Sequence, residues 1–150
     1  MRHTILAALL VSTLTPAVLA QTIGDEEYTA YQNQLAEDTW SLVSLQETLD
    51  VVLSEHDSIS EASEYDRGML NLVAGDALRT VDIMHIRSRT MFTKVEDNYE
   101  LYCLKGAPGP LPCADYKETY RAMIVDTIIQ GTIFYTITKE SRDILSQLNK

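Results

Sequence analysis

The chain has 150 residues, enough for one domain, with 45% apolar residues and a formal net charge of −10. This apolar content is too high for a disordered chain, and the acidic balance excludes a general nucleic-acid binder, which needs a basic face. A multi-span membrane protein is excluded by the near-neutral mean hydropathy. The acidity is uneven: residues 21–66 hold twelve Asp and Glu without any Lys or Arg, and residues 67–150 hold ten acids and eleven bases.

Residues 1–20 have the pattern of a secretory signal peptide. Arg2 supplies a positive charge, residues 5–14 form an apolar run, and Pro16 precedes a permitted cleavage site at Ala20. The apolar run is too short for a stable membrane anchor. We therefore expect an exported protein, periplasmic or secreted, whose single helical-bundle domain comprises residues 21–150.

The first element predicted after this leader is a long helix over residues 25–56. The segment contains no Gly or Pro, and its apolar residues recur at heptad spacing. Acidic residues at its start suit the positive end of the helix dipole. The residues expected to face inward are Tyr28, Tyr31, Leu35, Leu42, Leu45, Leu49 and Val52.

A second helix is predicted to begin at Ser58, which forms a capping-box pattern with Glu61. Further apolar residues at Met69, Leu72 and Ile83 widen its inward face, as expected for a helix that contacts two neighbours. A break near Asp97 is the alternative, which would give four helices, and Gly106 is a suitable C-terminal stop. The residues expected to face inward are Leu70, Val73, Ala77, Val81, Met84, Ser88, Met91 and Val95.

The two cysteines, Cys103 and Cys113, flank a turn-rich segment that holds three of the four prolines. An even number of cysteines in an exported chain favours a disulfide, and closing so short a loop contributes roughly 3 kcal/mol. The spacing is wrong for a C-x-x-C redox pair, and there are too few other ligands for a zinc site. We predict a structural disulfide.

A third helix is predicted from Ala114 almost to the end of the chain. Residues 124–138 are rich in β-branched side chains, so a hairpin at Gln130-Gly131 is the alternative. The inward stripe continues through that region, which favours the helix; its members are Tyr116, Tyr120, Met123, Thr127, Phe134, Ile137, Ser141 and Leu148. Short connections give antiparallel neighbours, so the predicted fold is all-α, an up-down-up bundle with one disulfide.

One polar layer is expected inside this bundle. If the first turn is centred on Asp57, then Asp38 and Asp76 lie level, and Arg142 reaches the same height from the third helix. Two close carboxylates cannot both remain ionised cheaply, so they would need an Arg, a proton or a cation. A salt-bridge layer that fixes the helix register, a ligand site, and an error of register all remain open.

Two further pairs of polar residues lie on the second and third predicted helices. By the same arithmetic Arg87 is expected to pair with Asp126. Asp82 and His85 have the spacing of half of a di-metal site, but the motif occurs once, so no metal site or cofactor is predicted. No nucleotide-binding, hydrolase or metalloprotease motif is present, and no catalytic residue is predicted.

Trp40 is predicted to point away from the core, on the most acidic helix. Tryptophan is enriched at interface hot spots, so it is a candidate anchor for a protein partner. The alternative is that it folds over a neighbouring helix. The candidate partner-binding residues are Glu37, Trp40, Val43, Glu47 and Asp50.

Four tyrosines are expected to gather at the disulfide end: Tyr99, Tyr102, Tyr116 and Tyr120. Rings packed inward with their hydroxyls in water are the main interpretation, and a pocket for an aromatic ligand is the alternative.

Two functions follow as hypotheses. The first is a non-enzymatic binding protein of the bacterial envelope, of inhibitor, immunity or adaptor type, whose acidic helix binds a basic protein partner. The second is a small-ligand or cation-binding bundle that uses the aspartate layer or the tyrosine end.

Overall fold

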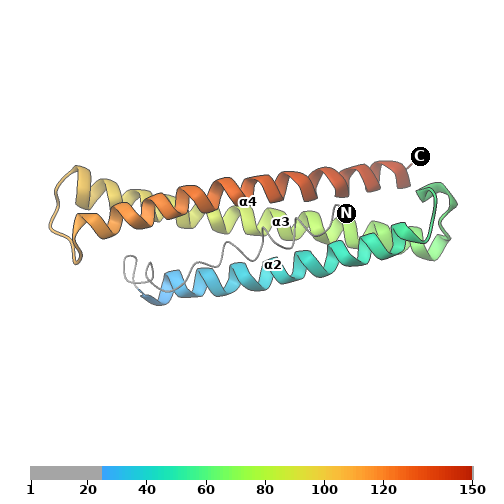
Figure 1. Cartoon of the computed structure of the whole chain (residues 1–150), viewed down its shortest axis with the longest axis horizontal. Coiled ribbons are helices and arrows are strands. Elements are labelled where there is room, and N and C mark those ends of the chain that lie inside the picture. Colours follow the sequence, from blue (N-terminus) through green and yellow to red (C-terminus); the bar gives the residue numbers. More distant parts are fainter. Residues whose placement is uncertain (1–24, 150) are drawn as a thin grey trace.

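The computed structural model describes residues 25–149, and the predicted signal peptide lies outside them. Three long α helices run antiparallel along a rod: α2 (Asp25–Ser54), α3 (Glu64–Tyr99) and α4 (Cys113–Leu148) (Figure 1). The predicted up-down-up bundle is confirmed. Helix α4 continues through residues 124–138, so the hairpin alternative is wrong. In the described part of the chain, no helix is long and apolar enough to cross a membrane.

The turn between α2 and α3 differs from the prediction. Ser58 precedes a short 3-10 helix, η1 (Ile59–Glu61), and its side chain makes no capping hydrogen bond. Helix α3 begins at Glu64 instead, where the Oγ of Ser63 accepts the backbone N–H of Asp66 at 3.1 Å. The predicted capping box is therefore wrong. Ile59 is buried in the core, and this contact holds the 3-10 turn against the bundle.

The connection between α3 and α4 begins with five further helical residues after the end of α3. Helix α3 passes directly into a π-helical segment, η2 (Glu100–Leu104), so the break predicted near Asp97 does not occur. Gly106 has a φ of +68°, which favours glycine and confirms it as the stop after the helix. The Cys103–Cys113 disulfide closes this turn.

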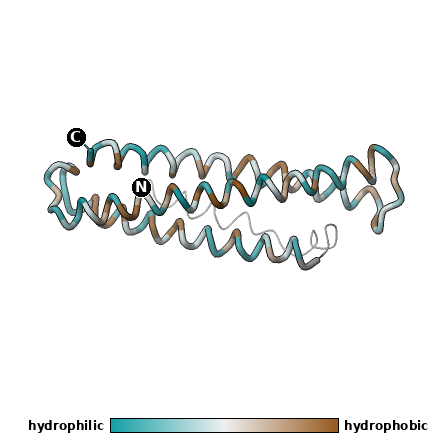
Figure 2. The backbone as a smooth tube through the Cα atoms, turned by 180° about the vertical axis from the view of Figure 1, so that it is seen from behind, coloured by the Kyte–Doolittle hydropathy of each residue, from teal (hydrophilic) through white to brown (hydrophobic). Residues whose placement is uncertain are grey.

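Helix α3 is central to the packing, since it contacts both α2 and α4. All eight residues of its predicted inward stripe are buried. The additional residues Leu72 and Ile83 are exposed, so the buried face is narrower than predicted. On α4, Thr127 is exposed, whereas Thr119 and Gln130 are buried. Figure 2 shows apolar residues recurring along each helix, as expected when every turn contributes to one continuous core.

Candidate functional site

The predicted layer of Asp38, Asp76 and Arg142 is not formed. Asp38, whose side chain is 16% exposed, forms an ion pair with Arg87 of α3. Asp76 pairs instead with Arg79 one turn away, at 3.5 Å, and Arg142 is exposed. Asp38 and Arg87 are equally far along the chain from residues 62 and 63, so the connection between α2 and α3 has its midpoint there and not at Asp57. The reason is that η1 and the Ser63 cap move the start of α3, which shifts the midpoint by more than one turn of helix.

A different polar contact connects the three helices inside the bundle. The hydroxyl of Tyr31 on α2 lies 3.1 Å from Ser88 Oγ on α3, and Ser88 donates a hydrogen bond to the side-chain oxygen of Gln130 on α4. All three residues are buried. The heptad pattern predicted Tyr31 and Ser88 to face inward, but Gln130 was not among the predicted inward residues. Its position seven residues from both Met123 and Ile137, which are buried, was the available signal.

Asp126 does not pair with Arg87 as predicted, because Arg87 binds Asp38. Burial raises the pKa of the Asp126 carboxyl group above its ordinary value. Burial, followed by the nearby charge of Asp126, also raises the pKa of Tyr28 to about 12. Near Tyr28, burial therefore favours the neutral form of the Asp126 carboxyl group over the charged form.

The outer face of α2 consists of Glu37, Trp40, Glu47 and Val51, all of them exposed. Trp40 is 67% exposed, so it does not fold over a neighbouring helix. The other two candidate residues lie differently: Val43 is partly buried against the central core cluster, and Asp50 is half-buried. Val43 is therefore a packing residue rather than a contact residue, because the core of a three-helix bundle covers a wider arc of α2 than one seam.

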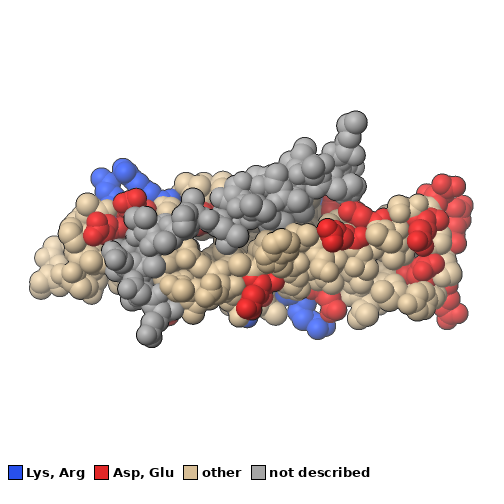
Figure 3. Space-filling view, turned by 60° about the horizontal axis from the view of Figure 1, so that its bottom comes forward, with Lys and Arg blue, Asp and Glu red and all other residues tan. Residues whose placement is uncertain are grey.

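Acidic side chains also gather at the end of the rod where α2 turns into α3 (Figure 3). The residues concerned are Glu55, Asp57, Glu61 and Glu64, all of which are exposed. They continue the acidic surface of α2, and together these positions lie in the part of the chain that carries no Lys or Arg. A basic surface would therefore meet negative charge along α2 and around this end.

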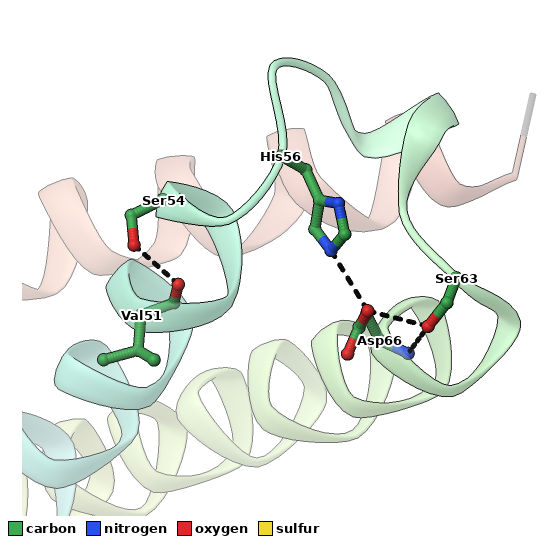
Figure 4. Close-up of polar contacts among 5 residues, drawn as sticks. All are labelled: Val51, Ser54, His56, Ser63 and Asp66. Carbon is green, nitrogen blue, oxygen red and sulfur yellow. Dashed lines mark hydrogen bonds and ion pairs between the residues drawn. The ribbon is translucent and has the colours of Figure 1, made fainter.

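Behind these acids, three polar side chains meet at the start of α3 (Figure 4). His56 Nε2 lies 3.0 Å from Asp66 Oδ2, and the Ser63 hydroxyl donates to the same oxygen at 2.7 Å. The Ser63 hydrogen bond, supported by His56, lowers the pKa of Asp66. In a hydrolase triad the histidine lies between the other two residues, whereas here both contact Asp66. The arrangement caps α3 and does not activate Ser63.

A cavity of about 250 Å³ lies beside His56. Its apolar wall comes from the ends of all three helices, including Leu53, Leu70 and Ile144. Of its polar lining residues, His56, Asp57 and Ser58 belong to the turn and Gln147 belongs to α4. The cavity follows from the turn crossing the open end of the bundle, and the hydroxyl that lines it, Ser58, is hydrogen-bonded to Ser60, whereas His56 contacts Asp66.

The tyrosine cluster predicted at the disulfide end is present. Tyr99 and Tyr120 stack with centroids 4.9 Å apart, and Tyr102 and Tyr116 stack at 4.8 Å. A Cβ atom on Gly109 would lie 2.8 Å from the Tyr102 ring, so only glycine lets the loop approach this closely. The rings stack on one another, which favours packing over a ligand pocket.

Within residues 25–149, no three His, Cys, Asp or Glu side chains come together in a group that could hold a metal ion. Comparisons with protein-family models, with curated proteins and with solved structures found no match. The function is therefore inferred from the surfaces described above, of which the outer face of α2 is the most distinctive.

Proposed function

We propose that this protein is an exported, non-enzymatic binding protein of the bacterial envelope, of inhibitor, immunity or adaptor type. The outer face of α2 would bind a basic surface on a protein partner. The observation that carries the proposal is the exposure of Trp40 on a helix without a single basic residue.

The chemistry of this face suits a protein partner. Trp40 offers a large apolar side chain, and exposed tryptophans that become buried on binding are typical hot spots. Glu37 lies three residues before it and Glu47 seven after it, so the apolar anchor has acidic residues on both sides. Such a field accelerates association with basic partners and disfavours acidic ones.

The envelope location rests on the leader-like residues 1–20 and on the disulfide. An oxidising compartment lets Cys103 and Cys113 remain paired, whereas cytoplasmic thiols are kept reduced. Export and the acidic binding face together support a role outside the cytoplasm, in the periplasm or after secretion.

The ligand-binding alternative loses most of its support. It depended on Asp38 and Asp76 facing each other, and each of them pairs with an arginine instead. It also depended on an open tyrosine end, where the rings stack on one another. We therefore propose only the protein-binding function.

The test is partner capture from the host envelope followed by affinity measurement with the purified partner. We expect Trp40→Ala to weaken binding at least about tenfold, since a hot spot contributes roughly 2 kcal/mol or more. Glu37→Lys with Glu47→Lys should slow association and remove its salt dependence. Tyr65→Ala is the matched control, because Tyr65 is an exposed aromatic residue on α3. A partner held equally by wild type and Trp40→Ala would contradict the proposal.

A further inference from the structure

Helix α4 carries a second ordered stripe on the side away from the core. We define the outer face of α4 as Arg121, Val125, Ile128, Tyr135 and Lys139, all of them exposed. Ile128 and Tyr135 are 66% and 71% exposed, among the highest exposures of large apolar side chains in the described part of the chain. Lys117 and Arg142 extend the stripe at its two ends and are exposed as well.

The spacing of this stripe is that of a helix-packing seam. From Arg121 to Lys139 its residues follow one another at intervals of three, four or seven. A helix that packs only against its own bundle needs one such stripe, and α4 already uses its inward one. A second stripe, apolar in its middle and cationic at both ends, is the pattern by which a helix accepts a partner helix.

The outer face of α2 has the complementary pattern. Glu37 and Glu55 lie 18 residues apart, and Arg121 and Lys139 also lie 18 residues apart. At 1.5 Å per residue the α4 pair spans about 27 Å, and Glu55 directly follows α2, which ends at Ser54, so it extends the acidic line of the outer face of α2 to nearly the same length. When the two helices are placed antiparallel, Glu37 comes opposite Lys139 and Glu55 comes opposite Arg121.

The apolar residues coincide in the same alignment. Trp40 falls beside Tyr135, and Val51 falls level with Val125. Each of these four side chains is more than half exposed in the single chain. Charge pairs would therefore form at both ends, with two apolar contacts between them, and Glu47 lies level with Ile128 between those contacts.

We propose that the outer face of α4 binds the outer face of α2 of a second copy of this chain, with the two helices antiparallel. The contact joins two different surfaces, so a pair of copies keeps one free α2 face at one end and one free α4 face at the other, and chains of copies result. The inference rests on the proposed function in using the same face of α2. A basic partner would therefore compete with the second copy for Trp40.

A flat anionic membrane fits this face less well. Glu118 and Asp143 are exposed and lie next to the cationic ends of the stripe, where a membrane surface would repel them. The occupant that matches both the charge and the spacing is a helix with the pattern of α2.

The experiment is sedimentation velocity of the purified protein over a range of concentrations and salt. We expect the average mass to rise past that of a dimer with concentration, and the rise to weaken at high salt. Arg121→Glu with Lys139→Glu, or Glu37→Lys with Glu55→Lys, should each weaken self-association roughly a hundredfold through like-charge contacts. Ile86→Glu, at an exposed apolar position on α3, is the control and should change nothing. Circular dichroism checks that every variant remains helical.

Mixing two variants that are each defective in a different face provides the decisive arm. The charge-reversed variants are unsuitable for it, because their reversed faces attract each other. Trp40→Ala and Tyr135→Ala, which lie on opposite faces, are therefore used for the mixture: each alone should associate weakly, and together they should form a dimer and little beyond it. The proposal would be overturned if the wild type stayed monomeric at every concentration. It would also be overturned if the wild type stopped at a dimer and the mixture of Trp40→Ala and Tyr135→Ala formed none. A third contradicting result is a wild type that does not self-associate but binds anionic vesicles, and does so as well as the Arg121/Lys139 variant.

The failure of this inference and of the proposed function can be distinguished. Arg121→Glu with Lys139→Glu leaves the α2 face intact, so capture of a basic partner should persist or increase. Trp40→Ala should weaken both interactions. Partner capture without self-association would overturn the inference alone, and self-association without any captured partner would contradict the proposed function alone.

Discussion

Helix α3 is held to its two neighbours by different chemistry. Towards α4 the contact ends in a disulfide and two stacked tyrosine pairs. Towards α2 it is marked by two ion pairs, Lys94 with Glu27 and Arg87 with Asp38, whereas Ser88 hydrogen-bonds both neighbours, Tyr31 on α2 and Gln130 on α4. Apolar clusters contribute to both contacts. The comparison indicates that α3 and α4 form the more strongly constrained hairpin, and that polar pairs decide how α2 is aligned on it.

The largest expected effect comes from removing an apolar side chain of α2. Leu42 is buried in the central cluster with residues of α3 and α4, so Leu42→Ala should lower the free energy of unfolding by about 2 to 5 kcal/mol. Native-state hydrogen exchange should show α2 losing protection before the α3–α4 hairpin. Leu72→Ala, at an exposed position, should cost less than about 0.5 kcal/mol. Equal loss of protection in all three helices would contradict the comparison.

The next effect concerns the constrained hairpin. Replacing both Cys103 and Cys113 by Ala should cost roughly 3 kcal/mol, because the unfolded chain regains the freedom of a short loop. Thermal unfolding measures the loss. Hydrogen exchange of backbone amides should become faster around the tyrosine stacks and remain unchanged in the connection between α2 and α3. Faster exchange confined to α2 would contradict the view that the disulfide constrains the α3–α4 hairpin.

A smaller effect is expected at the polar pair that aligns α2. Arg87→Met leaves the mostly buried Asp38 carboxylate without its cation, and should cost about 1 to 2 kcal/mol because Arg87 itself is partly solvated. Urea unfolding measures the cost. The matched control is Arg79→Met, whose pair with Asp76 is exposed and should contribute less than about 0.5 kcal/mol. If both variants behaved alike, the α2 pairs would have no special role.

The smallest effect depends on pH. Burial raises the pKa of the Asp126 carboxyl group, so its protonation contributes to the free energy of unfolding. This contribution is fully present below the ordinary carboxyl pKa and is lost as pH rises through the raised pKa. Asp126→Asn should therefore be more stable than wild type at neutral pH, and this advantage should vanish towards about pH 4. Urea unfolding across that range measures it. A variant less stable than wild type at neutral pH would show that the charged carboxylate is favoured.

Much of the architecture could be predicted from local patterns. Heptad spacing located the three helices, and the eight inward residues of α3 are all buried. The spacing of Cys103 and Cys113 predicted the disulfide, and Gly106 was correctly placed at the end of the helical segment. These predictions depend on neighbours along one helix or one loop, where the period of the backbone determines which side chains share a face.

The pairing between helices could not be predicted in the same way. Two serines, Ser58 and Ser63, each precede an acid by three residues, and the helix was predicted to begin at Ser58. The chain uses the second, because Ile59 is buried when residues 59–61 form a 3-10 turn. That choice moved the partner of Asp38 to Arg87 and left Asp76 on the surface.

The sequence by itself determined that the chain forms helices, which of their faces are apolar, that its acids are concentrated before Arg67, and that Trp40 lies opposite the main stripe of α2. Only the tertiary structure decided which residues meet across the helices: Asp38 with Arg87, Gln130 with Ser88, and Val43 with the core. The reason is physical. Periodicity is repeated in every turn, whereas the alignment of two helices depends on one connecting turn, and a shift of a few residues there exchanges every partner along their length.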